Sequence, residues 1–380
     1  MSFGTEHEYS INDAQFMPLP ISDRILTEIG GSLKNEIPLG EVIVSKELQK
    51  HVLEVVPSKP AMEIHALESD LMTGLRRLLQ FTSPRYLLMG LGMHPLLRLD
   101  MTGAWDHDEG EIYREYDRLF DIRQHGWLNI QALQINIPYH NEDDLIRLHN
   151  RIRSLLPFMV ALTASSPVVE GIRTDRMDNR LFYYRKNQER IPEICHDILP
   201  EKLRSLGEYL QIQERIYSKL RASKADILCQ EWLNSRGVIV RFSRECLEIK
   251  ALDEQDCIRS DMAILSLLLP LLRCRDLEIE EDPEELMNLL ETAIDRGTAN
   301  LKQELGWLLR KAEAEANADE LRYLPVIRKR IERGSLAESI DRQLQKGSPL
   351  GEILSGIACS LVTNRPFGLY QESRLRPQEH

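Results

Sequence analysis

The segment FGTEHEYSI, residues 3–11, alternates side chains as a β-strand does and contains two glutamates. Successive side chains of a strand point to opposite faces, so one face carries Gly4, Glu6, Glu8 and Ser10 and the other carries Phe3, Thr5, His7 and Tyr9. Glu6 and Glu8 lie two residues apart and therefore project from the same face, about 6–7 Å from one another. The segment predicts a strand that presents two neighbouring carboxylates.

Two other strand-like segments also contain a glutamate. Glu54 interrupts HVLEVVP and Glu248 interrupts CLEIKA. Glutamate is depleted in strands, and burying its uncompensated charge is costly. One compensation is a pair of hard divalent cations such as Mg²⁺, which takes oxygen ligands and keeps waters and substrate phosphates in its shell. The alternative is that each glutamate lies on the solvent face of an amphipathic strand.

Hydrophobic periodicity predicts an α+β fold. Further strands are expected at residues 52–56, 86–89 and 130–137, and a β-hairpin at 238–242 and 246–251. Helices are expected at residues 63–81, at 142–164 with Asn141 as N-cap, and at 209–220. Residues 30–40, which contain Gly30, Gly31, Pro38 and Gly40, are expected to form a connection. Beyond Asp261 the pattern predicts helices at 263–272, 284–295, 301–316 and 323–346.

Composition narrows the class of protein. The net charge of −12 argues against nucleic acid or an anionic membrane as the main partner, although a local arginine cluster with bound metal could still hold a nucleotide. No apolar run approaches the roughly 20 residues that span a bilayer. The start of the chain lacks a secretory signal pattern, and the six cysteines include no C-x-x-C pair. We therefore expect a cytoplasmic enzyme with reduced thiols.

Other motifs carry weaker signals. His94 follows Gly90-Leu91-Gly92-Met93 and precedes Pro95, so it could be a ligand or phosphate contact at a strand end, or a structural loop residue. The two glycines lack the third glycine and the following helix of a dinucleotide-binding fingerprint. The sequence also lacks the P-loop, G-x-S-x-G and H-E-x-x-H motifs, and no nucleophile stands out.

Five short motifs, in order along residues 3–275, resemble those of the glutamate–cysteine ligase family of the second type, also called the carboxylate–amine ligase family. The segment GTEHEY is similar to its G-x-E-x-E opening, and Glu47 with Glu54 resembles its second acidic motif. Gly92-Met93-His94-Pro95 is similar to its G-T-H-P segment. LPFMVALTASSP, residues 156–167, followed by Gly171, matches L-P-x-x-x-A-L-x-A-x-S-P-x-x-x-G, and Leu247-Glu248-Ile249-Lys250 resembles a Leu/Ile-Glu-x-Arg strand.

The resemblance implies a glutamine-synthetase-like fold, in which a curved antiparallel sheet forms a funnel lined by glutamates and flanked by helices. Residues 1–275 would form the catalytic region, and residues 276–380 a helical extension packed on the same unit. By this likeness the metal ligands would be Glu6, Glu8, Glu54 and Glu248. Arg180 would lie near the substrate and phosphates, and Lys250 would contact phosphate. The cofactor-binding candidates are Glu47, His94, Gln134 and Asn136.

This chain departs from the family pattern at two places. Many members carry His-x-His where this chain has Gln134-Ile135-Asn136, and an amide is a weaker metal ligand than an imidazole. Lys250 stands in place of an arginine, which keeps the charge but loses the bidentate grip on phosphate. Both departures are compatible with an altered substrate or with reduced activity.

The function implied by the resemblance is ATP-dependent ligation of a carboxylate, that of glutamate by family likeness, to an amine through an acyl phosphate. Mg²⁺, or alternatively Mn²⁺, would assist, and the chain could form a homo-oligomer. Two rival functions stay open at this stage. One is phosphoryl transfer by a guanidino or amine kinase on the same kind of sheet, and the other is a non-catalytic relative that binds ATP and metal.

Overall fold

The computed structural model describes residues 2–369, and one antiparallel sheet of eight strands lies at its centre. The strand order is β2-β3-β4-β1-β6-β10-β9, with β5 also paired to β1. The strands are β1 (Gly4–Asn12), β2 (Glu36–Leu39), β3 (Val42–Lys46), β4 (Val52–Pro57), β5 (Leu87–Met89), β6 (Ala132–Pro138), β9 (Val238–Arg241) and β10 (Cys246–Asp253). β7 (Val168–Val169) and β8 (Ile172–Arg173) form a separate small ribbon. The expected α+β class is confirmed, as are the predicted strands and the β9–β10 hairpin.

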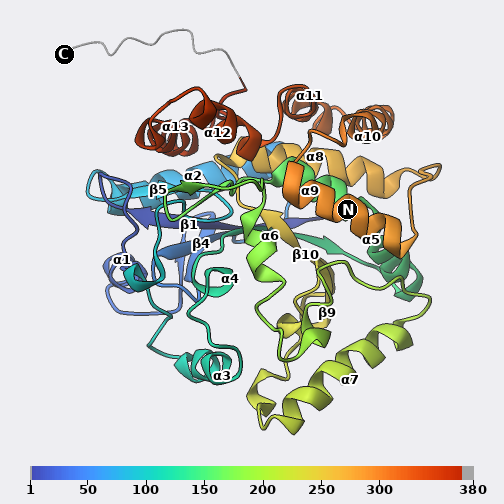
Figure 1. The fold of residues 1–380 in the computed structure, drawn as a ribbon, viewed down its shortest axis with the longest axis horizontal. Coiled ribbons are helices and arrows are strands. Elements are labelled where there is room, and N and C mark those ends of the chain that lie inside the picture. The colour runs from blue at the N-terminus through green and yellow to red at the C-terminus, as the bar shows by residue number, and fades with distance from the viewer. Residues whose placement is uncertain (1, 370–380) are drawn as a thin grey trace.

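Long helices cover one face of the sheet (Figure 1). The inner layer contains α2 (Ile64–Thr82), α5 (Glu142–Thr163) and α8 (Ile258–Arg273). Asn141 caps α5 as predicted, because its side chain accepts a hydrogen bond from the amide of Asp144. α8 is apolar around nearly its whole circumference because it lies between the sheet and an outer layer of helices.

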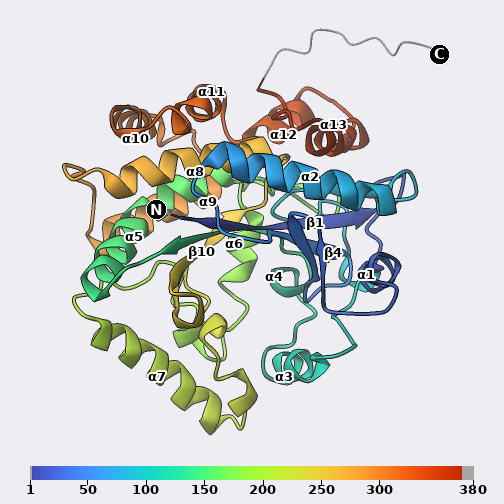
Figure 2. The ribbon, with the colours of Figure 1, turned by 180° about the vertical axis from the view of Figure 1, so that it is seen from behind.

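The outer layer comes from the C-terminal part of the chain (Figure 2). It contains α10 (Lys302–Glu315), α11 (Leu324–Arg333), α12 (Leu336–Gln345) and α13 (Leu350–Thr363), while α9 (Pro283–Arg296) packs beside α5. Leu305 and Leu308 of α10 belong to the same apolar core as Leu265 of α8. The division into a catalytic region and a helical extension stays a prediction.

A second group of helices lies on the opposite side of the sheet (Figures 1 and 2). They include α3 (Gly110–Phe120), α4 (His125–Leu128), α6 (Asn179–Tyr184) and α7 (Leu206–Ala222), while α1 (Ser22–Gly30) packs beside β2 and β3. Among the helices of residues 2–369, none is both long and apolar enough to cross a bilayer. The cytoplasmic location stays a prediction.

Two sequence-based expectations are wrong. Residues 30–40 are not merely a connection, because β2 lies within them and pairs with β3. β2 is the edge strand, and a proline, which lacks a backbone N–H, is tolerated there because no further strand needs a hydrogen bond from it. Residues 323–346 do not form one helix. α11 ends before Gly334, whose φ of 98° favours glycine, and Ser335 then caps α12 by accepting from the amide of Glu338. The apolar periodicity continued across this break because each helix buries one side, α11 in the large core that includes α8 and α12 in a smaller cluster with Met89 of β5.

Candidate active site

The four predicted metal ligands lie on one face of the sheet, in a set we call the acidic row (Glu6, Glu8, Glu54 and Glu248). Register places Glu8 directly opposite Glu54, Glu6 opposite Gln134, and Asn136 opposite Glu248. Directly opposed residues of antiparallel strands project to the same side. The intervening residue His7 contacts Asp261 of α8, so the acidic row faces away from the inner helix layer. The sequence pattern alone predicted this clustering for β1, and strand pairing extends it across three strands.

A cleft of about 420 Å³ opens over part of the acidic row. Its lining includes Glu6, Glu54, Ser45, Asn136 and Arg244. Glu6 and Glu8 are largely buried, with 8 % and 6 % of their surfaces exposed. Glu6 and Glu54 therefore line a hollow large enough for a small ligand, and Glu8 lies next to it without lining it.

The two amides that replace the family's histidines donate hydrogen bonds to the row. Asn136 Nδ2 lies 2.9 Å from Glu6 Oε1, and Gln134 Nε2 lies 3.1 Å from Glu8 Oε1. The backbone amide of Ala132 lies 2.8 Å from the other oxygen of Glu8. The side-chain amides of Gln134 and Asn136 thus orient the two carboxylates. Their N–H groups are sufficient for this role, so neither side chain needs to bind a metal.

Three carboxylates of the site lack a cationic partner. Burial raises the pKa of Glu54 well above its usual value, and the charges of Glu6 and Glu47 raise it further. Burial and the charge of Glu47 likewise raise the pKa of Glu8. Burial also raises the pKa of Glu47, against the opposing charge of Lys46. Across residues 2–369 no ion pair joins a cation to Glu8, Glu47 or Glu54, whose partners are amides and the Ser45 hydroxyl. Glu47 therefore belongs electrostatically to the acidic row.

The other two members of the row are paired with arginines of the β9–β10 hairpin. Arg244 Nη1 lies 2.6 Å from Glu6 Oε1, and Arg241 forms an ion pair with Glu248. Burial is the largest influence on the pKa of Glu6 and raises it, but Arg244 and Asn136 together bring the value below normal. The sequence analysis did not identify either arginine. Both arginines lie in the segment 238–245, which the sequence analysis used only to define the hairpin.

The two predicted basic residues meet beside the row. Asp178 accepts from the amide of Leu181 and so begins α6, which places Arg180 in its first turn. Arg180 Nη2 donates to the carbonyl of Lys250 at 2.9 Å, and its Nη1 forms an ion pair with Asp253 Oδ1 at 3.8 Å. Its Nε is buried without a hydrogen-bond partner among the described residues. Its charge lowers the pKa of Glu8 against the larger, opposing effects of burial and Glu47. Lys250 Nζ lies 3.9 Å from Glu248 Oε1 and donates to the Trp232 carbonyl at 3.1 Å.

His94 is separate from these contacts. It is fully buried, its Nε2 lies 2.6 Å from Asn12 Oδ1, and its Nδ1 accepts from the amide of Leu96 at 3.2 Å. Burial lowers the pKa of the imidazole to about 3, so it is neutral. These contacts favour the structural alternative for His94, and a cofactor contact stays a prediction.

Known proteins resemble this chain in sequence. The family model of glutamate-cysteine ligase family 2 matches residues 2–354. An uncharacterized protein from Archaeoglobus fulgidus is 50% identical over 338 residues, which are 89% of this chain and 91% of that protein. A putative glutamate–cysteine ligase 2 from Leifsonia xyli subsp. xyli is 28% identical over 188 residues, covering 48% of this chain and 47% of that protein.

Solved structures share the fold at low sequence identity. Glutamate–cysteine ligase from Francisella tularensis in complex with AMP has a TM-score of 0.69 at 11% identity, covering 97% of this chain and 90% of that chain. A bifunctional glutathione synthetase from Pasteurella multocida has a TM-score of 0.64 at 14% identity, and this chain spans 52% of its length. The match over residues 2–354 shows that the chain belongs to glutamate-cysteine ligase family 2.

Proposed function

We propose that this chain is an ATP-dependent ligase that joins a carboxylate, the γ-carboxylate of glutamate by family likeness, to a small amine. The observation that carries the proposal is the acidic row, where Glu8 and Glu54 form no ion pair within residues 2–369 and the charge of Arg180, whose Nη1 is paired with Asp253 at 3.8 Å, also acts on Glu8. Membership of the ligase family supports the reaction class. The Francisella tularensis enzyme of the same fold, solved with AMP, supports a nucleotide site.

The donor set fits hard divalent cations. The acidic row offers only carboxylate oxygens, and its pKa values are raised by burial and by mutual repulsion at Glu8 and Glu54. Mg²⁺ prefers oxygen ligands of this kind, and Mn²⁺ accepts them as well. Glu6, Glu8, Glu54 and Glu248 would hold the ions, with Glu47 as a further candidate. The ions would supply positive charge that offsets the repulsion between the carboxylate substrate and the phosphates of ATP.

In the proposed reaction a substrate carboxylate oxygen attacks the γ-phosphorus of ATP, which forms an acyl phosphate and releases ADP. The amine nitrogen then attacks the acyl carbon, loses a proton, and expels inorganic phosphate as the amide forms. Arg180 supports this sequence because its Nε has no hydrogen-bond partner in the described part of the chain and can donate to a phosphate or carboxylate oxygen, while its Nη1 forms an ion pair with Asp253. Lys250 would add a point charge for the transferring phosphoryl group. No protein nucleophile is required.

Gln134 and Asn136 bear on the substrate. Both amides donate to carboxylates of the row, so replacing the family's histidines removes two neutral ligands while fixing Glu8 and Glu6 in orientation. Arg244 lines the cleft beside Glu6 and is half-exposed, which leaves it able to meet an anionic substrate group. These features support a substrate pair that differs from that of members with His-x-His.

The test is ADP release with Mg²⁺ over a matrix of carboxylates and amines, with glutamate and cysteine as the first pair. Glu8→Gln and Glu248→Gln should each abolish the release, because each removes a charge from the acidic row. Glu214→Gln, at an exposed site on α7, is the matched control and should keep full activity. Full activity in both row variants would refute the assignment.

Product analysis separates the rival functions. An amide product accompanied by ADP and phosphate supports the ligase. A stable phosphorylated product without amide would identify phosphoryl transfer to a guanidino or amine acceptor. Binding of ATP with Mg²⁺ but no turnover across the whole matrix would identify a non-catalytic relative.

A further inference from the structure

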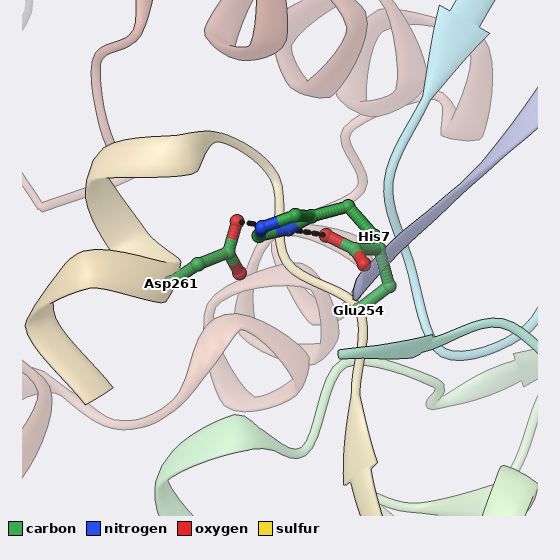
Figure 3. A group of neighbouring side chains, drawn as sticks. All are labelled: His7, Glu254 and Asp261. Carbon is green, nitrogen blue, oxygen red and sulfur yellow. Dashed lines mark ion pairs between the residues drawn. The ribbon is translucent and has the colours of Figure 1, made fainter. Parts of the chain in front are cut away.

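A second polar cluster lies on the opposite face of the sheet from the acidic row. Figure 3 shows His7 from β1, Glu254 just beyond β10, and Asp261 from the first turns of α8 converging on one point. His7 Nδ1 lies 3.2 Å from Asp261 Oδ2 and 3.6 Å from Glu254 Oε1. All three side chains are fully buried. We call this set the buried triad (His7, Glu254 and Asp261).

Several polar atoms at the buried triad lack hydrogen-bond partners. They are His7 Nδ1 and both carboxylate oxygens of Asp261, together with the hydroxyl of Tyr9, whose ring stacks beside that of His7. Among these atoms, His7 Nδ1 and Asp261 Oδ2 are within ion-pair distance of one another, which counts as a pair only when the imidazole is protonated. Buried polar atoms without partners are rare in folded proteins, and a group of them at one point indicates an ion or water between them. Glu254 differs, since its oxygens accept from the backbone amides of Glu8 and Gln255.

We propose that the buried triad binds one Zn²⁺ ion through His7 Nδ1 and one carboxylate oxygen each from Glu254 and Asp261. Ligands placed tetrahedrally about 2.0–2.2 Å from one zinc ion are separated from each other by about 3.3–3.6 Å. The separation of 3.6 Å between His7 Nδ1 and Glu254 Oε1 lies at the upper end of that range, and the separation of 3.2 Å between His7 Nδ1 and Asp261 Oδ2 lies just below its lower end. An imidazole with two carboxylates is also a ligand set that zinc accepts.

The remaining ring nitrogen is arranged for this role. His7 Nε2 lies 2.8 Å from Thr5 Oγ1, and when Nε2–H donates to this hydroxyl the lone pair of Nδ1 is left for a metal. Metal-bound histidines commonly have their other nitrogen held by such a partner. The net charge also fits zinc. Zn²⁺ with two carboxylates and a neutral imidazole has no net charge, and an uncompensated charge at a fully buried site would be costly.

An exposed cluster of the same residue types provides a contrast. Asp23, Asp106 and His107 also bring their ligand atoms together, but Lys50 forms ion pairs with both aspartates. Its ammonium already supplies the positive charge there, and Asp106 and His107 are exposed. We therefore expect no retained ion at that cluster, which makes it a matched internal control.

The test measures zinc in the intact chain. Protein produced in zinc-supplemented medium is exchanged into buffer with EDTA to strip accessible ions, and zinc is then counted by mass spectrometry. We expect about one zinc per chain, retained because the triad is fully buried. His7→Asn and Asp261→Asn should lower the retained zinc by about tenfold or more. His107→Asn should leave it unchanged.

Glu8→Gln keeps this inference distinct from the proposed function. That variant should lose ligase activity and still retain zinc, whereas zinc loss in Glu8→Gln would place the ion in the acidic row and overturn the inference. If the triad variants fail to fold, X-ray absorption at the zinc edge of the wild-type chain decides, since the triad predicts one imidazole nitrogen and carboxylate oxygens. Wild-type protein without retained zinc would also overturn the inference and leave the triad as an imidazolium held by two carboxylates.

Discussion

β1 presents two faces that use the same kinds of side chain in different ways. Glu6 and Glu8 lie on the side of the cleft, which Glu6 lines together with Glu54. His7 and Tyr9 lie on the side of α8 and are almost completely buried. On the cleft side the carboxylates repel one another, and the pKa of Glu8 is raised by burial and by Glu47. On the helix side the carboxylates meet an imidazole. The difference shows that surroundings, and not residue type, decide which acids are available to a ligand.

The two faces are also connected. We call the side of β1 that is covered by α8 the closed face. Glu254 of the buried triad accepts a hydrogen bond from the backbone amide of Glu8 at 2.9 Å, so a group on the closed face holds the strand that carries Glu6 and Glu8. Its other oxygen lies near His7. Perturbing the cleft should therefore affect activity far more than stability, and perturbing the closed face should affect stability first.

The largest expected effect concerns Glu54 on the cleft side. Glu54→Gln should lower kcat for ADP release by about 10³-fold or more, which corresponds to about 4 kcal/mol. Because burial, Glu6 and Glu47 all raise the pKa of this carboxyl, removing its charge should also raise the melting temperature by about 1–2 °C in Mg²⁺-free buffer. Steady-state kinetics and calorimetry measure the two changes. A Glu54→Gln variant that is less stable than the wild type but fully active would contradict the proposed contrast between the two faces of β1.

The next effect tests the closed face. Glu254→Leu removes one partner of a buried charge cluster and should lower the free energy of unfolding by about 3–5 kcal/mol. Glu254→Gln keeps an acceptor for the Glu8 amide and should cost about 1–3 kcal/mol. Denaturant titration of both variants gives the comparison. Equal stability of the two variants and the wild type would mean that the closed face contributes nothing to the fold.

Glu201 lies away from both faces of β1 and forms an ordinary ion pair, so it serves as a reference for the carboxylates on those faces. Arg236 donates to it through Nε at 2.7 Å and Nη2 at 2.9 Å. Burial is the largest influence and raises the pKa of Glu201, but Arg236 outweighs it and lowers the value to about 2 from 4.5. A carboxyl with a depressed pKa stabilises the fold above its unfolded pKa, and this contribution is lost as the pH falls from 4.5 toward 2.

Glu201→Gln should therefore destabilise the chain at pH 7 by about 2–3 kcal/mol, opposite in sign to Glu54→Gln. The difference from the wild type should shrink between pH 4.5 and 2, as the wild-type ion pair is lost. Unfolding free energies measured across this range provide the test. A difference that is constant with pH would show that Arg236 and Glu201 interact without a charge contribution.

Much of the cleft side could be predicted from the sequence, and little of the closed side. Alternation in residues 3–11 placed Glu6 and Glu8 on one face, and ordered motifs added Glu54 and Glu248. Register then assembled the row, which spacing within one strand cannot show. Arg244 and Glu254 escaped prediction because their roles depend on contacts across more than 200 positions of the chain. The triad has no local signature, since His7, Glu254 and Asp261 meet only when α8 packs on β1.

The smallest expected effect is a change in KM for ATP when Lys250, on the cleft side, is replaced. Lys250 binds the Trp232 carbonyl and lies near Glu248, and it offers a phosphate only a point charge. Lys250→Arg restores the residue of the family pattern and should lower KM for ATP by about 3–10-fold with kcat little changed, because a guanidinium can donate two parallel hydrogen bonds to phosphate. Lys250→Met should raise KM instead. Unchanged KM in both variants would separate Lys250 from the nucleotide, whereas the expected pair of shifts would show that the affinity for ATP can be tuned at a position next to Glu248.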